Sequence, residues 1–339
     1  MSTKAEVFAI QTELVKRVLA QHLTAGNAES LAEQVIRGAG GGLELDDFNN
    51  WLECRFKPQL VWLDNDDYTR AITRALPQAL KFAAADFGSA RQRDLGQLWT
   101  DTARGFLGEI AFKRFLQEKL NILIKHDISI GKPIDGYIST DIKTVSEPKE
   151  GYERPPKINV SVKTGKFNAR WMDEYSAAKI KMIDAFVFVR VGTVREHFIA
   201  FLKAISFLGT KLFPAAEKLG ELTTQTSKEL WDSIPQFESV PAYISGYLMR
   251  NQLNLPIHDL HIKARGKKNK CILITQGVGT FSLEVLRADA RIKAIDPDGK
   301  LPLVIDGIGS EVGDNLHFYA NTGALTFGMD NWQKFVNLL

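Results

Sequence analysis

The stretch KINVSVKTGKF, residues 157–167, together with DAFVFVRV, residues 184–191, decides the fold of this chain. The first stretch alternates apolar and polar residues, as does a strand with one buried face. Its valines point to one side, and polar side chains share the opposite face: Asn159, Ser161 and Lys163. The second stretch is a continuous apolar run, which is typical of a strand buried on both faces. The two stretches predict a central sheet with a lysine on one of its faces.

Upstream of these strands, the sequence predicts a helix and two further strands. Residues 95–120 place apolar side chains at three- and four-residue spacing, and Glu109 falls among them. The segments NILIKHDISI, residues 121–130, and YISTDIKTV, residues 137–145, have strand character. MDEYSAAKIKMI, residues 172–183, is typical of a short helix. The predicted order is helix, three strands, helix, strand, which is an α/β arrangement.

Three regions follow from the same patterns. Residues 1–95 indicate a helical N-terminal region, residues 96–210 the α/β core, and residues 211–339 a mixed and then β-rich C-terminal region. Segment HFIAFLKAISFLG, residues 197–209, suggests a strand that passes into a helix. For the C-terminal region we consider two roles, DNA recognition and dimerisation.

Composition sets broad limits on function. The chain has 339 residues, 45% of them hydrophobic, and a formal net charge of +3, which permits a nucleic-acid partner without requiring one. Cys54 and Cys271 lie far apart, so they indicate neither a zinc site nor a disulfide framework. No run of about 18 apolar residues is present, and no membrane span is expected. We expect a cytoplasmic location with both thiols reduced.

Acidic residues and a lysine on neighbouring strands suggest phosphodiester chemistry. That hydrolysis needs an activated water, neutralisation of charge on the phosphate and help for the leaving oxygen. Mg²⁺ held by carboxylates meets these needs, and a lysine beside the attacking water adds a cation. Asp141, in the strand before Lys163, is placed to be such an acid.

Two assignments compete for the acid and the lysine. In the first, Asp141 binds the metal and Lys163, in Ser161-Val162-Lys163, is the catalytic lysine. In the second, Asp127 binds the metal, and Asp141-Ile142-Lys143 supplies the acid and the lysine. A helix is expected between the lysine-bearing strand and the next core strand. That order favours the first assignment, although the spacing of the second is tidier.

This arrangement resembles the PD-(D/E)XK nuclease superfamily, and INVSVKTGKFNARWMDE, residues 158–174, followed by DAFVFVRV looks like a type II restriction endonuclease. The resemblance implies a restriction-endonuclease-like core of order αβββαβ, with a mixed central sheet flanked by helices. Glu109 matches the glutamate of the first core helix, Asp141 the motif aspartate and Lys163 the motif lysine. Mg²⁺ is the implied cofactor.

Ser161 departs from the family motif, because it stands where the motif has Asp or Glu. A subgroup of restriction enzymes has a similar Ser-x-Lys and takes the missing acid from the following helix. Glu174, eleven residues after Lys163, is the matching candidate, and Glu109 is the alternative. The implied metal ligands are therefore Asp141 with Glu109 or Glu174. Structural roles are also open: a glutamate at the rim of a helix for Glu109, and an acid at a helix N-terminus for Glu174.

Basic and amide side chains around the lysine-bearing strand are candidates for contacts with DNA. Lys and Arg near phosphates give affinity, and Arg or Asn in the major groove gives sequence choice. The candidates are Lys157, Lys166, Asn168 and Arg170. An exposed loop without a ligand is the alternative interpretation.

The sequence therefore predicts a Mg²⁺-dependent, site-specific endodeoxyribonuclease of the type II restriction class, acting on double-stranded DNA. Cutting both strands of a palindrome calls for two active sites related by a twofold axis, so a homodimer is expected. A structure-selective or repair nuclease with the same core is one alternative. A DNA-binding protein that has lost catalysis, as Ser161 would permit, is the other.

Overall fold

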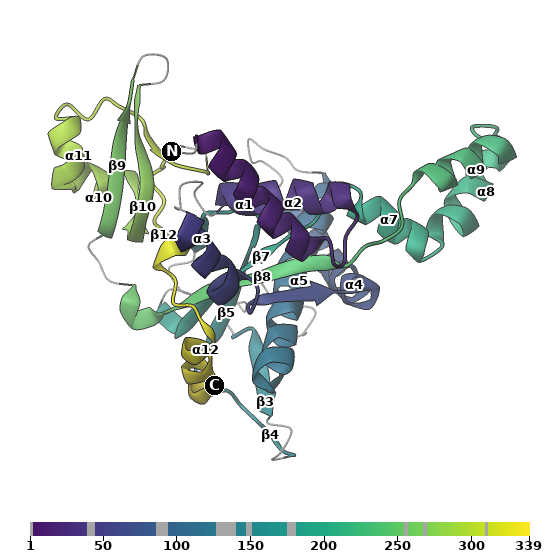
Figure 1. The fold of residues 1–339 in the computed structure, drawn as a ribbon, viewed down its shortest axis with the longest axis horizontal. Helices are drawn as coiled ribbons and strands as arrows, with labels where there is room; N and C mark the ends of the chain where they lie inside the picture. The colour runs from purple at the N-terminus through teal and green to yellow at the C-terminus, as the bar shows by residue number, and fades with distance from the viewer. Residues whose placement is uncertain are drawn as a thin grey trace.

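The computed structural model describes residues 3–38, 45–85, 94–126, 140–146, 151–174, 181–253, 257–266, 270–308 and 311–339. The fold is mixed α/β, as the sequence predicts (Figure 1). Asp127 of the alternative site lies outside the described residues.

A four-stranded mixed sheet forms the centre. Its strands, in spatial order, are β1 (Leu60–Leu63), β8 (Val240–Met249), β7 (Ala185–Val191) and β5 (Val160–Lys166). β5 and β7 run parallel, whereas β8 runs antiparallel to both of its neighbours. Every residue of β7 is buried, which confirms the prediction from its continuous apolar run.

Helices cover one face of this central sheet. Its buried side chains share one core with α4 (Asn65–Ala85), α5 (Leu95–Leu120) and α12 (Met329–Leu338). The predicted helix over residues 95–120 is therefore confirmed as α5. Asp94 caps the start of α5 by accepting the Gln97 N–H at 2.8 Å, and Asn121 ends it in the left-handed conformation at φ 55°.

A glycine lets α5 come close to β5. A Cβ at Gly108 would lie 1.9 Å from Thr164 Oγ1, a distance that no real side chain tolerates. The Thr164 hydroxyl also donates to the Gly105 carbonyl at 3.2 Å. Glu109 is thus carried on a helix turn that touches the lysine-bearing strand.

A second, five-stranded sheet packs against the other face. It consists of β6 (Trp171–Glu174), β9 (His258–Arg265), β10 (Cys271–Phe281), β11 (Leu303–Ile305) and β12 (His317–Asn321). Phe186 and Phe188 of β7 share a buried cluster with Met172 and Phe318 of this sheet. In the parallel β5–β7 register Ser161 pairs with Phe186 and Lys163 with Phe188. Ser161 and Lys163 therefore point toward the second sheet, away from α5.

A small antiparallel sheet adjoins the start of β5. It contains β2 (Leu123–His126), β3 (Ile142–Ser146) and β4 (Glu153–Arg154). Just before β3, the Asp141 N–H donates to the Val160 carbonyl at 2.8 Å. β2, β3, β5 and β7 follow α5 in chain order, but the prediction lacks β4 and β6, which lie between them, and β2 and β3 pair with each other in this small sheet and not in the central one.

The three predicted regions share one sheet. The N-terminal region is helical over α1 (Lys4–Leu19), α2 (Ala25–Gly38) and α3 (Leu45–Trp51), but it also contributes β1 to the central sheet. The C-terminal region contributes β8, together with the short helices α10 (Leu283–Ala288) and α11 (Ala290–Ile295). Turns of other helical types also occur: η1 (Leu52–Phe56), η4 (Arg250–Gln252) and η5 (Thr322–Ala324). Buried Gln59 accepts from Trp332 Nε1 at 3.0 Å and donates to the Ile244 carbonyl at 2.6 Å, so it joins both terminal regions.

Two local predictions are wrong. Residues 172–174 form part of strand β6 and not the start of a helix; Lys181 and Met182 are helical, and residues 175–180 are outside the described part. Pairing with β12 explains the strand, because tertiary contacts override local propensity. The segment 197–209 does not begin as a strand: it is helical from its first residue as α7 (His197–Ala204), in which His197, Ala200 and Phe201 bury one helical face.

A helical arm, residues 205–234, projects from the body at the right of Figure 1. It contains η3 (Leu208–Leu212), α8 (Phe213–Lys218) and α9 (Thr224–Ser233). Among the described residues, no single helix has the length and hydropathy of a membrane span. The bent pair His197–Ala204 and Leu208–Lys218, with 68° between its halves, meets both criteria together.

Candidate active site at the lysine-bearing strand

Lys163 and Glu174 meet between the two sheets. Lys163 Nζ lies 2.5 Å from Glu174 Oε2. The Glu174 side chain is 1% exposed, whereas that of Lys163 is 20% exposed and so still reaches solvent. Glu174 is held on β6 by the pairing of that strand with β12. The acid and the lysine therefore come from two different sheets, and the expected role of Glu174 at a helix N-terminus is replaced by a buried ion pair.

Ser161 lies on the same face of β5 as Lys163. It is 2% exposed, and its Oγ makes no hydrogen bond to any described residue. A buried hydroxyl without a partner is unusual, since most buried polar groups are hydrogen-bonded. On β5 itself the chain thus places a small polar group, and no carboxylate, two residues before the lysine.

Asp141 meets β5 where β3 and β5 diverge. Its Oδ2 accepts the Val162 N–H at 2.6 Å, and its own N–H bonds to Val160. The Asp141 carboxylate thus accepts from the Val162 N–H, where a neighbouring strand would normally offer a backbone carbonyl. Asp141 is consequently fixed one residue from Lys163 along β5.

Glu109 approaches from the opposite side of the sheet, on α5. Its Oε2 lies 3.9 Å from Nδ1 of His126, too far for a hydrogen bond. The same Nδ1 lies 3.0 Å from the Asp141 carbonyl oxygen. Burial lowers the pKa of His126 to about 4, so its ring is neutral near pH 7. Burial also lowers the pKa of Arg74, which the nearby Glu109 carboxylate opposes.

We call Asp141, Ser161, Lys163 and Glu174, with Glu109 and His126, the β5 cluster. Ser161 and Lys163 belong to β5, and Asp141 and Glu174 contact that strand from just before β3 and from β6. Glu109 of α5 and His126 of β2 lie on either side of Asp141. Sequence reasoning missed His126. Its position at the end of β2 opposite Ile142, next to Asp141, is a signal that the pairing of these two strands makes visible.

Lys143 lies apart from this cluster. It is exposed on β3, a strand that pairs with β2 and β4 and is not hydrogen-bonded in register to β7. Lys163, by contrast, stands on the strand that runs parallel to β7. The choice between the two assignments stays a prediction, because Asp127 and residues 175–180, where the separating helix is expected, lie outside the described residues.

The predicted DNA contacts do not form one patch. Lys166, the last residue of β5, and Asn168, just after the strand, are exposed. Lys157 precedes β5 and contacts the C-terminal residues of the chain, with Nζ 3.3 Å from the Asn337 carbonyl. The length of β5 separates these two sets by roughly 20 Å. Arg170 is held in place by Asp306 at 2.6 Å.

Interleaved aromatic residues belong to the core. Phe167 is 1% and Trp171 5% exposed, and the two lie in different buried clusters. The loop from residue 168 to residue 170 is therefore anchored at both ends by buried aromatic side chains. Lys166 and Asn168 are the members of the predicted DNA-binding set that remain exposed there.

The donor chemistry of the β5 cluster suits Mg²⁺, which prefers oxygen ligands and usually takes one or two carboxylates while it keeps several waters. Asp141 with Glu174 or Glu109 offers such a set. Within the described ranges, no three His, Cys, Asp or Glu side chains lie close enough together to hold a metal ion. A site built from protein ligands alone is thus not formed by these residues as they stand.

Comparison with family models, curated proteins and solved structures finds no significant match.

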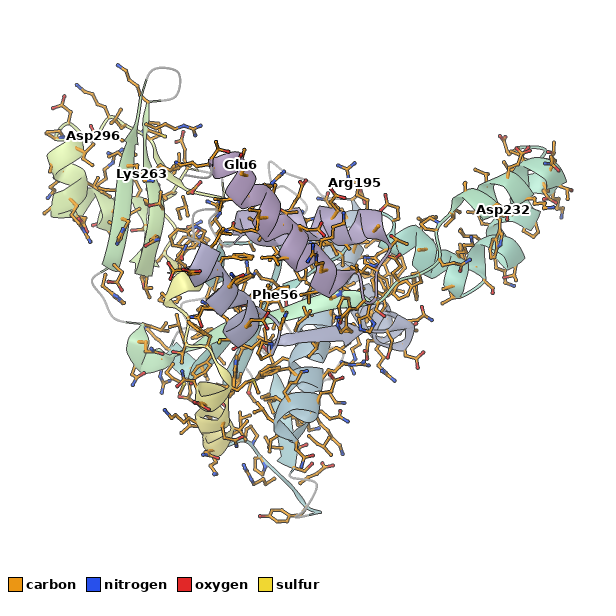
Figure 2. All side chains as sticks on the ribbon, viewed as in Figure 1. Glu6, Phe56, Arg195, Asp232, Lys263 and Asp296 are labelled. Carbon is orange, nitrogen blue, oxygen red and sulfur yellow. The ribbon has the colours of Figure 1, made fainter. Side chains whose placement is uncertain are left out.

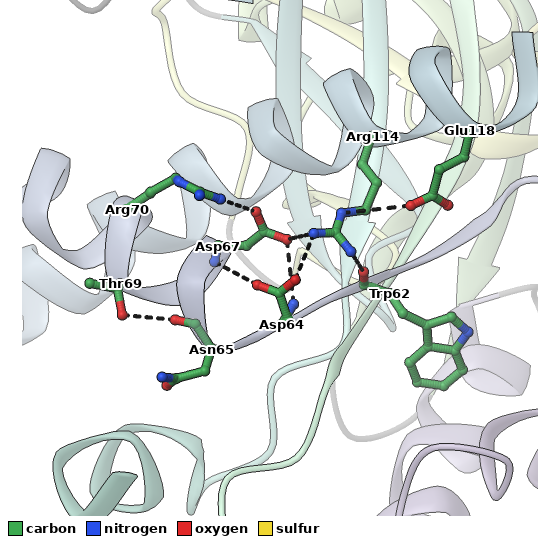
Figure 3. Close-up of polar contacts among 8 residues, drawn as sticks. All are labelled: Trp62, Asp64, Asn65, Asp67, Thr69, Arg70, Arg114 and Glu118. Carbon is green, nitrogen blue, oxygen red and sulfur yellow. Dashed lines mark hydrogen bonds and ion pairs between the residues drawn. The ribbon is translucent and has the colours of Figure 1, made fainter. Parts of the chain in front are cut away.

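A second acidic cluster, which we call the cap cluster, lies at the start of α4 (Figure 3). Asp64 and Asp67 form a reciprocal cap: the Asp67 N–H donates to Asp64 at 2.9 Å and the Asp64 N–H to Asp67 at 3.4 Å. Arg114 of α5 bridges them, at 2.8 Å from Asp64 and 2.5 Å from Asp67. Burial raises the pKa of Asp67, and Arg114 opposes the shift. Backbone N–H groups and the Arg114 guanidinium bind these carboxylates, so we assign the cap cluster a structural role.

Proposed function

We propose that the chain is a Mg²⁺-dependent endodeoxyribonuclease of the PD-(D/E)XK type, with the site specificity of a type II restriction enzyme. One observation carries the proposal: the Asp141 carboxylate meets β5 at Val162, and the next residue, Lys163, faces Glu174 at 2.5 Å. Strands β2, β3, β5 and β7 follow α5 in that chain order and β5 runs parallel to β7, which supports the proposal; β4 and β6 are additional strands, and β2 and β3 pair outside the central sheet.

The proposed chemistry assigns each side chain a role. Asp141, with Glu174 or Glu109, would hold Mg²⁺. A bound Mg²⁺ would activate the attacking water and neutralise charge on the phosphate. Lys163, whose side chain is 20% exposed on the edge strand β5, would place a cation beside the attacking water. The Val162 N–H keeps the Asp141 carboxylate pointed at the sheet edge during this step.

Exposed Lys166 ends β5 and exposed Asn168 follows it, so the proposal places the DNA at that end of the strand. Lysine near a phosphate supplies affinity, and an amide in the major groove supplies sequence choice. Lys157, near the other end of β5, would contact a separate part of the duplex. The expected cytoplasmic location stays a prediction.

A DNA-binding protein without catalysis is the second candidate, and a specific observation favours it. Ser161 replaces the strand acid, and Lys163 is already engaged by Glu174. In that case the β5 cluster would only stabilise the contact between the two sheets.

Incubation with plasmid and phage DNA tests the proposal, with Mg²⁺ in one arm and a chelator in the other. Discrete fragments that require Mg²⁺ support a restriction nuclease. Cleavage confined to branched or mismatched substrates supports a structure-selective or repair nuclease. Retarded mobility with uncut DNA in both arms supports the non-catalytic alternative.

A further inference from the structure

Strands β9 and β10 carry an excess of positive charge. Residues 257–281, which contain both strands, have five lysines and arginines and one acid, Asp259, so their net charge is +4. The whole chain has a net charge of +3, so all other residues together sum to −1. Asp259 lies near the start of β9, where its carboxylate is 3.3 Å from His258. Positive charge is thus concentrated on one strand pair and is not spread over the molecule.

Three of these cations, Lys263, Arg265 and Lys270, are exposed, and we call them the basic edge. β9 is hydrogen-bonded only to β10 among the described strands, so its other edge is open. Lys263 and Arg265 stand two residues apart on β9 and therefore project from the same face. Figure 2 shows Lys263 at the left of the molecule, on the side opposite the helical arm with Asp232.

The cations of the basic edge differ from those that follow β10. Within the described residues, none of the three lies within ion-pair distance of an acid. Cations further along the chain are held by acids, in the pairs Arg287–Asp296 at 2.6 Å, Arg291–Asp289 at 2.6 Å and Lys300–Asp298 at 3.0 Å. The charges of the basic edge therefore remain available to an anionic partner.

Protection of the sheet edge is one structural explanation for these charges. Lysine on an edge strand opposes pairing with a strand of a second chain. That role accounts for Lys263 and Arg265, which lie on β9. It does not account for Lys270, which directly precedes β10, an inner strand of the sheet.

A lipid surface fits the basic edge less well than a polyanion. Protein segments that bind anionic membranes place large apolar side chains beside their cations. Of the large apolar side chains that are exposed in the described part of the chain, none falls between residues 257 and 281. A partner that binds through charge alone fits better, and the phosphate backbone of a nucleic-acid duplex is such a partner.

The basic edge belongs to the same sheet as Glu174. Lys263 is paired with Leu273 of β10. Seven residues further along β10, Thr280 is paired with Phe318, which in turn is paired with Glu174. This length of strand and three strand spacings separate Lys263 from Glu174 by roughly 28 Å. That distance is about eight base pairs of B-DNA, less than one helical turn, so a single duplex is long enough to reach both places.

We propose that the basic edge binds the phosphate backbone of double-stranded DNA, outside the part of the duplex that the β5 cluster and Asn168 would contact. The choice of DNA as the polyanion rests on the proposed function, whereas the anion-binding surface does not. Contacts to phosphates position a protein on DNA without reading the bases. The basic edge would therefore strengthen binding to every sequence alike.

Fluorescence anisotropy with a labelled duplex of about three helical turns and arbitrary sequence tests the proposal. A chelator prevents cleavage, and salt is varied from about 50 to about 200 mM. Each phosphate contact contributes about 0.9 to the slope of log affinity against log salt. The double variant Lys263→Ala/Arg265→Ala should therefore have a slope that is smaller by roughly 1.8, and its affinity at about 0.1 M salt should fall tenfold or more.

Lys218→Ala/Lys228→Ala is the matched control. It removes the same amount of charge from the helical arm, where both lysines are exposed. Its salt slope should equal that of the wild type, because the control leaves the basic edge intact. Far-UV circular dichroism checks that both double variants are folded.

Several results would overturn the inference. One is a wild-type slope in Lys263→Ala/Arg265→Ala, and another is an equal change of slope in the control. Aggregation of the variant in sedimentation velocity, with unchanged DNA affinity, would assign these cations to edge protection. Tighter binding of the wild type to anionic lipid vesicles or to RNA than to duplex DNA would exclude DNA as the partner.

Plasmid cleavage in Mg²⁺ separates this inference from the proposed function. Cleavage by the wild type, together with an unchanged salt slope in Lys263→Ala/Arg265→Ala, would remove the basic edge and leave the nuclease proposal standing. The predicted loss of slope without any cleavage would support the basic edge and remove the nuclease proposal.

Discussion

The β5 cluster and the cap cluster both place acidic and basic side chains close together, and they differ in what those side chains serve. In the cap cluster, Asp64 and Asp67 close the first turn of α4, and Arg114 completes the arrangement from α5. In the β5 cluster, Lys163 stands in the middle of a strand, opposite an acid from another sheet. Its neighbour Ser161 has a hydroxyl without a hydrogen-bond partner among the described residues.

This difference gives a criterion for distinguishing a structural cluster of charged residues from a functional one. Charged side chains that bond to backbone N–H groups, as Asp64 and Asp67 do, stabilise the local backbone, and this structural role explains their presence. A lysine between two sheets does not end a helix or a strand, and the proposed function gives Lys163 a role in chemistry instead. Substitutions in and around the two clusters test this difference.

The largest effect is expected for activity in the β5 cluster. Lys163→Ala and Asp141→Ala should each lower cleavage by about 1,000-fold, which is roughly 4 kcal/mol of transition-state stabilisation. DNA binding and the urea midpoint should change little. Rates are measured on plasmid DNA in Mg²⁺, and affinity by mobility shift.

A buried histidine near the cap cluster predicts acid sensitivity. His197 accepts the Val194 N–H at 2.8 Å beside Tyr68, and burial lowers its pKa to about 4 from the ordinary 6.5. Between pH 6.5 and pH 4 the unfolded chain binds a proton that the folded chain does not. Stability is therefore complete above pH 6.5 and falls by about 3 kcal/mol as the pH drops to 4.

His197→Asn keeps an acceptor for the Val194 N–H and removes the titrating ring. Urea unfolding at several pH values should show a flatter acid limb than in the wild type. An acid limb that stays as steep in the variant would show that other groups cause the loss. Activity at pH 7.5 should be unchanged, because His197 lies away from the β5 cluster.

Asp67→Ala should lower the free energy of unfolding by about 2 kcal/mol, because it removes the reciprocal cap and a buried partner of Arg114. Cleavage at a temperature where the variant is folded should stay near the wild-type rate. Glu13→Ala is the matched control: it breaks an exposed pair with Arg17 and should change stability by less than about 0.5 kcal/mol. Equal losses of unfolding free energy in Asp67→Ala and Glu13→Ala would contradict a structural role for the cap cluster.

Ser161→Ala is expected to give the smallest change. Because the Ser161 hydroxyl is buried without a hydrogen-bond partner in the described residues, its removal leaves no other polar group unsatisfied. Stability should stay within about 0.5 kcal/mol of the wild type or rise slightly. A clear loss in thermal unfolding would indicate a hidden partner for the hydroxyl.

The spacing of apolar residues in the sequence predicted the elements that carry the candidate site. α5 begins and ends where its pattern and caps place it, and β7 is buried on both faces as its apolar run requires. Alternation in β5 also set Ser161 and Lys163 on one face. These features depend on local spacing, which a single sequence contains.

Long-range pairing explains what the sequence did not reveal. β8 joins the central sheet from almost 50 residues after β7, and the short β6 becomes a strand because β12 pairs with it. The position of Glu174 at Lys163 depends on that pairing. His126 escaped attention for the same reason, since its contact with Asp141 requires β2 and β3 to meet.

The most direct test compares Lys163→Ala with Lys143→Ala in one Mg²⁺-dependent plasmid cleavage assay. Both variants remove a lysine two residues after a candidate acid position, but Lys143 is exposed on β3 and Lys163 faces Glu174. We expect Lys163→Ala to lower cleavage by about 1,000-fold and Lys143→Ala to cut at close to the wild-type rate. Loss of cleavage in Lys143→Ala with full activity in Lys163→Ala would contradict it.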